Sequence, residues 1–238
     1  MSKFRKLKLE LRERLSGKGW RACLQELAQV AEPQEYVGPL MALLPQPGIL
    51  RWRGMQGLGA VVPELARLNM EEARVVMRRL MWHMNEESGN LGWGIPESMA
   101  EILAGSETLA REFDRILFSY ARDSGREDNY IDYAPLLQWC FWGAGRLAQA
   151  RPDLAGQAAE SFIAGLSHED AGVRCQAALA LAKYLEAVGR GLEAGSADKA
   201  RDGLRKLEGE ATECEDFDGE QVIYRKASQL AARGLALL

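Results

Sequence analysis

Apolar residues recur every three or four positions along almost the whole chain, which is the spacing of one face of an α-helix. The first such run comprises Phe4, Leu7, Leu11 and Leu15, and similar runs follow to the end of the chain. No segment shows convincing alternation of apolar and polar residues, the pattern of a half-buried strand. Glycine, proline and capping residues interrupt the pattern at short intervals. The sequence therefore predicts an all-α protein, in which a helix at 196–209 is followed by an acidic loop up to residue 219 and a last helix at 220–237.

The predicted helices pair, and the second helix of each pair carries a related motif. The motif is a run of three mostly small residues: Gly57-Leu58-Gly59, Ser98-Met99-Ala100, Gly143-Ala144-Gly145, Ala178-Leu179-Ala180 and Gln229-Leu230-Ala231. The central residues of these runs are separated by 41, 45, 35 and 51 positions. A period of roughly 40–47 residues is typical of stacked two-helix repeats, whose helices approach closely where side chains are small. We expect one array of helical hairpins, at approximately 2–31, 33–68, 70–104, 106–150, 152–188 and 196–237.

The most regular repeat lies at residues 170–182. Asp170 and the pair Val173-Arg174 open its second helix, and a ridge of alanine and leucine follows. Over roughly residues 166–188 this pattern resembles the HEAT-like repeats of phycobilisome lyase proteins. The whole chain is also similar to uncharacterised bacterial HEAT-repeat proteins that carry the elbow N-E-E/D-S-G-x-x-G-W-G, here residues 85–94. The resemblance implies an armadillo-type right-handed α-α superhelix of about six hairpins, but not lyase activity, because fold and function are separable.

Composition limits the possible partners and location. The 238 residues are 47% hydrophobic, which suffices for a sizeable core. The net charge of −4 argues against a nucleic-acid partner, which requires a basic footprint. Four separated cysteines without a C-x-x-C pair favour a reducing compartment. The basic start lacks the apolar run of a secretory signal, and no apolar run reaches the ~20 residues of a membrane helix. We expect a cytoplasmic protein with no membrane partner.

Motifs for metal, cofactor or catalysis are absent from the sequence. His83 and His168 are the only histidines, and neither has a second histidine or a cysteine at metal-ligand spacing. Asn85 with Glu86 and Glu87 could in principle hold Mg²⁺ or Ca²⁺, but the alternating acidic loop of an EF-hand is missing. There is no Walker A sequence and no nucleophile elbow. We expect no cofactor, no metal and no catalytic residue, although the sequence leaves catalysis open.

The elbow, residues 81–94 with Pro96 and Glu97 after it, is the densest mixture of aromatic, acidic and amide groups in the chain. Glu86 and Glu87 follow the carbonyl end of the preceding helix, where a carboxylate is unfavourable by about 0.3–1 kcal/mol. A placement that works against stability indicates a function. The competing structural interpretation has Ser88-Gly89 as a helix cap, with Trp82 and Trp93 as wedges between repeats. In that interpretation the glutamates pair with Arg78 or Arg79.

Two other segments occupy the equivalent place in neighbouring repeats: Arg51-Trp52-Arg53 before the elbow and residues 129–133 after it. Equivalent turns of stacked repeats lie on the order of 10 Å apart. Aromatic residues and arginine are enriched at binding hot spots. We therefore predict one binding patch on the edge and concave face, made of Arg51, Trp52, Arg53, Asn85, Glu86, Glu87, Ser88, Trp93, Glu97, Tyr130, Asp132, Tyr133 and Trp139.

Three functions are compatible with this patch. The first is a non-catalytic scaffold that binds a protein or peptide partner through the concave face. The second is DNA binding or DNA-glycosylase-like chemistry, for which Trp139, Trp142 and Asp132 could supply the aromatic and acidic groups. The third, implied only by the repeat resemblance, is an accessory role in cofactor or chromophore maturation. The sequence favours the first and does not determine the partner or the oligomeric state.

Overall fold

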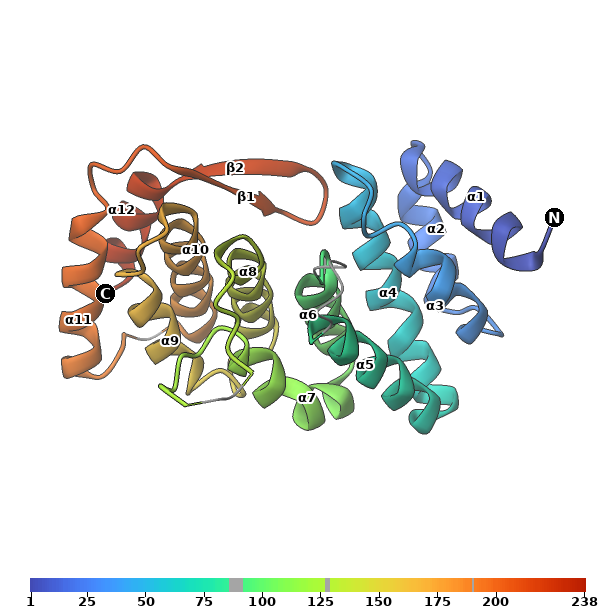
Figure 1. Cartoon of the computed structure of the whole chain (residues 1–238), viewed down its shortest axis with the longest axis horizontal. Coiled ribbons are helices and arrows are strands. Elements are labelled where there is room, and N and C mark those ends of the chain that lie inside the picture. Colours follow the sequence, from blue (N-terminus) through green and yellow to red (C-terminus); the bar gives the residue numbers. More distant parts are fainter. Residues whose placement is uncertain (86–91, 127–128, 190) are drawn as a thin grey trace. The chain divides into compact units, whose positions relative to one another are not determined.

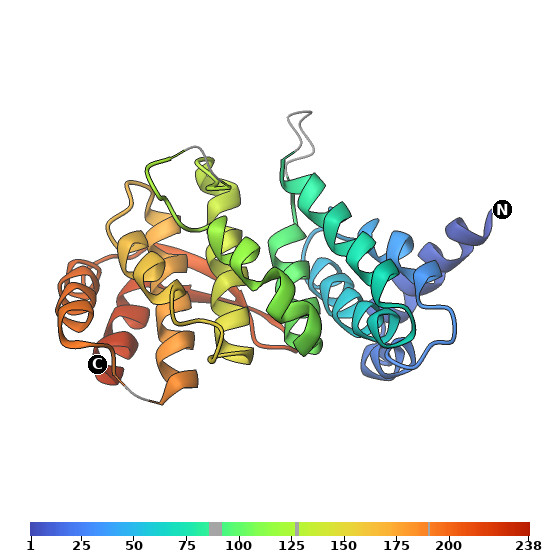
Figure 2. The ribbon, with the colours of Figure 1, turned by 90° about the horizontal axis from the view of Figure 1, so that it is seen from below.

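The computed structural model describes residues 1–85, 92–126, 129–189 and 191–238. The chain forms two compact units, Met1–Phe113 and Asp114–Leu238, and each is described here by itself. Within the described residues there are twelve helices and one two-stranded sheet (Figures 1 and 2). The all-α class predicted from periodicity is confirmed, while the division into six hairpins of one array stays a prediction.

The first unit consists of helices that follow one another with short connections: α1 (Lys3–Ser16), α2 (Trp20–Leu27), α3 (Gln34–Met41), α4 (Ile49–Leu68), α5 (Met70–Met84) and α6 (Ile95–Gly105). The boundary between the units lies within α7 (Glu107–Ser119). Asn69 caps α5, since its side-chain oxygen accepts a hydrogen bond from the Glu72 N–H at 3.4 Å. Pro63 lies inside α4, which continues through it to Leu68.

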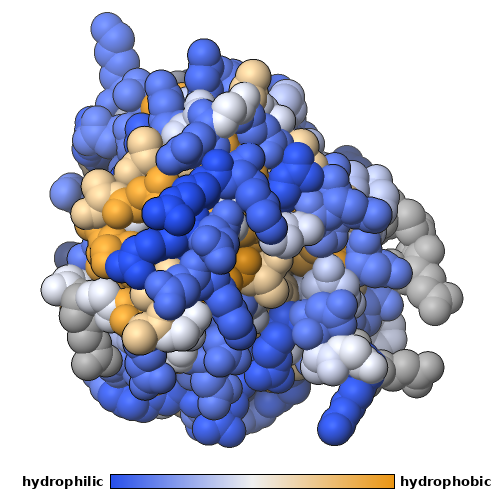
Figure 3. Space-filling view, turned by 90° about the vertical axis from the view of Figure 1, so that its left-hand side faces the viewer, coloured by the Kyte–Doolittle hydropathy of each residue, from blue (hydrophilic) through white to orange (hydrophobic). Residues whose placement is uncertain are grey.

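The second unit contains α8 (Ala134–Ala150), α9 (Ala158–Gly165), α10 (Ala171–Val188), α11 (Ala194–Lys206), β1 (Glu213–Phe217), β2 (Val222–Lys226) and α12 (Ala227–Leu237). Asp170 caps α10, accepting from the Val173 N–H at 2.8 Å. α11 turns charged side chains such as Asp198, Lys199 and Asp202 to solvent. The face of the molecule on that side is mostly hydrophilic, with apolar side chains grouped between the charged ones (Figure 3).

The β-hairpin corrects the sequence prediction of an acidic loop followed by a helix from residue 220. β1 and β2 pair antiparallel, with Glu213 opposite Lys226 and Phe217 opposite Val222. Cys214 and Asp216 of β1 point into the protein. The buried Asp216 breaks the alternation of apolar and polar residues that would predict a strand, because an acidic residue is normally expected in a solvent-exposed loop.

Small residues of the repeat motif lie where helices approach most closely. A Cβ added to Gly145 of α8 would lie 2.7 Å from the Ala180 Cα of α10, and one on Gly59 of α4 would lie 2.9 Å from the Glu101 Cβ of α6. The central motif residues are all buried: Leu58, Met99, Ala144, Leu179 and Leu230. The predicted second helices are thus α4, α6, α8, α10 and α12, and within each unit successive ones pack together.

Candidate binding site beside the elbow

The predicted segment Arg51-Trp52-Arg53 lies in the first turns of α4, where Trp52 is buried and Arg53 contacts other helices of the first unit. The Trp52 side chain is 1% exposed. The Arg53 guanidinium lies 4.6 Å from the centroid of the Trp20 ring and donates to the Leu15 carbonyl at 2.6 Å, near the end of α1. Burial and the nearby charge of Arg21 lower the pKa of Arg53. Trp52 therefore offers no exposed ring to a partner, and Arg53 stabilises the end of a neighbouring helix.

The described residues of the elbow differ in exposure. Trp82 is 71% exposed at the end of α5, so it is not a buried wedge, and Trp93 is 37% exposed. Asn85 is exposed and ends α5, with its N–H donating to the Trp82 carbonyl at 3.1 Å. Glu97 is buried in the first turn of α6. Glu86, Glu87 and Ser88 lie outside the described residues, so their predicted contributions remain untested.

The remaining predicted residues belong to the second unit. Tyr130 is half-buried and lines a pocket of about 400 Å³ together with Arg122 and His168. Burial, followed by the charge of Asp123, raises the pKa of Tyr130. Trp139 is half-buried, and the last two predicted residues, Asp132 and Tyr133, are exposed. Because the two units are described separately, a patch that joins these residues to the elbow stays a prediction.

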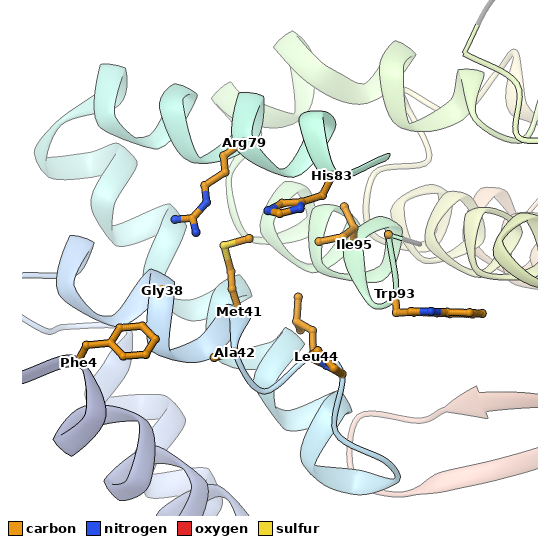
Figure 4. Close-up of a pocket in the computed structure, with 11 residues that line it drawn as sticks. Phe4, Gly38, Met41, Ala42, Leu44, Arg79, His83, Trp93 and Ile95 are labelled. Carbon is orange, nitrogen blue, oxygen red and sulfur yellow. The ribbon is translucent and has the colours of Figure 1, made fainter. Parts of the chain in front are cut away.

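A pocket of about 270 Å³ lies beside the elbow in the first unit. Its apolar lining comes from four parts of the unit: Phe4 of α1, Met41 of α3, Leu44 after α3, and Ile95 of α6. Arg79 and His83 of α5 line the same pocket, and Figure 4 shows both side chains extending toward Met41. Trp93 lies at the rim, with its ring directed away from the other labelled side chains (Figure 4). The pocket thus combines an apolar floor with two nitrogen-bearing side chains on one wall.

The turn at the end of the elbow brings Trp93 and Ile95 to this pocket. Gly94 has a φ of +76°, a left-handed conformation that favours glycine. A Cβ at Gly94 would also lie 3.0 Å from the Met55 Cε and 3.1 Å from the Leu44 Cβ. The Ile95 N–H closes the turn by donating to the Gly92 carbonyl at 2.9 Å. Gly94 therefore lets the chain fold back tightly against the pocket wall.

The charged side chain described on the pocket wall is the guanidinium of Arg79. Arg79 and His83 are one helical turn apart on α5, so both reach the same side of the helix. Among the residues that the structure describes, no carboxylate lines the pocket and Arg79 has no ion-pair partner. The neighbouring Arg78, by contrast, pairs with Glu71 at 2.5 Å. A guanidinium beside an apolar floor can bind a carboxylate attached to an apolar group.

Sequence reasoning missed most of this pocket. The spacing of Arg79 and His83, four residues apart on the helix before the elbow, was a usable signal. No such signal marked Phe4, Met41 and Leu44, because each follows the ordinary helical pattern of core residues. Their approach to α5 depends on how the helices pack.

No protein-family model matches this chain, and no curated protein matches it. Solved structures do match. A designed armadillo repeat protein in complex with the peptide (KR)4 is 14% identical to this chain, covers 99% of both chains and has a TM-score of 0.50. A computationally designed armadillo repeat protein for modular peptide recognition is 13% identical, covers 96% of this chain and 98% of its own, and has a TM-score of 0.48. An engineered protein is 16% identical over 100% and 98% of the two chains, with a TM-score of 0.47.

The chain has an armadillo-like helical-repeat fold. At these identities the likeness shows the fold alone. Across the described ranges no helix is long and apolar enough to cross a membrane. The same ranges hold no group of three or more histidine, cysteine or acidic residues that could bind a metal ion.

Trp142, one of the three residues considered for DNA chemistry, is not available at the surface. The Trp142 ring is buried, and its indole N–H donates to the Asp216 Oδ1 at 3.0 Å. Asp216 also accepts from the Lys183 Nζ at 2.7 Å. Trp142 therefore belongs to a buried polar cluster of the second unit and cannot stack on a base.

Proposed function

We propose that this chain is a non-catalytic scaffold that binds a protein or peptide partner, with the elbow end of the first unit as the anchor. The observation that carries the proposal is the pocket beside the elbow with Trp93 at its rim and Trp82 exposed nearby in sequence. An exposed tryptophan at the rim of an apolar pocket is typical of binding hot spots. The designed armadillo protein in complex with a peptide shows that a chain of this fold class can serve as a peptide binder.

The wider predicted patch is part of the same proposal. Asn85 and Trp93 supply its polar and aromatic groups in the first unit, and Asp132 and Tyr133 offer exposed groups in the second. Four free, buried cysteines support the expectation of a reducing, cytoplasmic location. An accessory role in chromophore maturation rests only on the resemblance of residues 166–188 to lyase-type HEAT repeats.

Quantitative affinity capture tests the proposal. The wild-type chain, Trp93→Ala and Glu86→Ala are immobilised at equal density and exposed to lysate, and captured proteins are measured by mass spectrometry. Tyr224→Ala is the matched control, because Tyr224 is an exposed aromatic residue on β2, outside the first unit. Loss of a hot-spot aromatic costs roughly 2 kcal/mol or more, so the specific partner should fall at least about tenfold with Trp93→Ala. Unchanged recovery with both Trp93→Ala and Glu86→Ala refutes the elbow as anchor.

A further inference from the structure

We infer that the pocket beside the elbow binds the C-terminal residue of a partner chain, its free carboxylate on Arg79 and its apolar side chain on the floor. This inference rests on the proposed scaffold function and states the chemistry of the same site. The floor is made by Phe4, Met41, Leu44 and Ile95, and Arg79 is on the wall above it.

Charge determines which polar group the pocket accepts. Among the described residues that line the pocket, the ionisable side chains are those of Arg79 and His83, and none is a carboxylate or a phenol. A cationic ligand group would therefore meet the like charge of Arg79, whereas a carboxylate would meet the planar fork of a guanidinium. His83 lies one turn further along α5 and lines the same wall of the pocket.

Size determines how large the bound group is. The pocket measures about 270 Å³, just below the roughly 300–1,000 Å³ of pockets that enclose a whole drug-sized ligand. It therefore suits one residue of a larger partner better than a free cofactor. The partly exposed Trp93 at its rim offers an aromatic surface to the residues that precede the bound one.

A C-terminal residue carries both required groups on one Cα. Its α-carboxylate and its apolar side chain can reach the wall and the floor of a small pocket together. An internal acidic residue would need a second residue to supply the apolar group, and its backbone would have to pass through the pocket. Binding of a single terminal residue therefore fits the small volume of the pocket and the position of Arg79 on one wall.

The test uses N-acetyl-phenylalanine, which mimics a C-terminal residue, and titrates it into the ¹⁵N-labelled full chain at neutral pH. The indole N–H resonance of Trp93 at the rim reports binding. Two comparison probes are N-acetyl-phenylalanine amide, which lacks the carboxylate, and acetyl-Glu-Phe-amide, which carries it on an internal side chain. The free acid should bind at least about tenfold more tightly than either, as expected for one charge-assisted bidentate contact.

Variants on α5 separate the carboxylate contact from general effects. Arg79→Gln should reduce the preference for the acid over the amide to less than about twofold. Arg78→Gln is the matched control, since Arg78 is the adjacent exposed arginine, pairs with Glu71 and does not line the pocket. The control should keep the full preference. Far-ultraviolet circular dichroism checks that both variants keep the helical content of the wild type.

Several results would overturn the inference. Equal binding of acid and amide by the wild type removes the carboxylate contact, and this result does not depend on any variant folding. Tighter binding of acetyl-Glu-Phe-amide assigns the pocket to an internal acidic segment. A preference that survives Arg79→Gln removes Arg79 from the site. Because these titrations use defined probes, their failure leaves the capture result with Trp93→Ala standing, so the two proposals fail separately.

Discussion

Asp216 of β1 anchors the β-hairpin to the helices beneath it and offers a measurable test of that packing. Its carboxylate is 3% exposed. It accepts from the Lys183 Nζ at 2.7 Å, the Trp142 Nε1 at 3.0 Å and the Phe217 N–H at 2.8 Å. The Lys183 Nζ also lies 4.7 Å from the Trp142 ring centroid. Lys183→Met removes the charge partner and leaves the other two donors in place.

The expected loss follows from this geometry. Removing one partner of a buried ion pair costs about 3–5 kcal/mol, because the remaining charge is left uncompensated. The Arg225 Nε, 3.6 Å from the second Asp216 oxygen, still offsets part of that charge. We therefore expect Lys183→Met to lower the free energy of unfolding by about 3 kcal/mol, at the lower end of the range. The double variant Lys183→Met/Asp216→Asn removes both charges and keeps an acceptor for Trp142, so it should be more stable than Lys183→Met by at least about 1 kcal/mol.

Urea unfolding of the whole chain, followed by the ¹⁹F resonance of 5-fluorotryptophan at Trp142, measures the stability of the second unit. A loss below about 1 kcal/mol for Lys183→Met would refute the assigned role of the pair, and so would a double variant less stable than the single one. The pH dependence gives a separate check. Burial tends to raise the pKa of Asp216, but the Lys183 charge and the donated hydrogen bonds outweigh it and lower the pKa below 3.8. Because the pKa of Asp216 is lowered in the folded state, its charge stabilises the fold above about pH 4, and this stabilisation is lost as the pH falls further. The difference in the free energy of unfolding between the wild type and Asp216→Asn should therefore shrink below about pH 4.

Two further outcomes follow from packing and burial. Alanine is favoured over glycine inside a helix by about 1 kcal/mol. A Cβ added at Gly195 of α11 would have no atom within 4 Å, so Gly195→Ala should be neutral or stabilising in thermal unfolding. Gly145→Ala should instead lower the stability of the folded chain by about 1–3 kcal/mol, because the added Cβ would collide with the Ala180 backbone. Equal effects of the two substitutions would disprove the close approach of α8 and α10. All four cysteines are buried, and both the contact with Cys175 and burial raise the pKa of the Cys214 thiol. Ellman's reagent should therefore label the folded chain only at the rate of unfolding, and rapid labelling of Cys214 would contradict its burial.

Sequence by itself determined the helical class and much of its local detail. Asn69 and Asp170 each have an extended backbone conformation and cap the next helix, because a cap depends on residues three positions away. The small residues of the repeat motif, such as Gly145, marked the helices that pack together. These properties depend on short-range interactions or on the absence of a side chain, and both are visible in the order of residues.

Tertiary structure decided which side chains are buried and which residues form a site. Periodicity placed Trp52 and Trp82 on helices but did not show that the first is in the core and the second is in solvent. The inward position of Asp216 depends on Lys183, which is 33 residues away in the chain. The pocket brings Phe4 together with α3, α5 and α6. Contacts between residues so far apart in the sequence arise from the way whole helices pack against one another. A local pattern of apolar residues does not determine that packing.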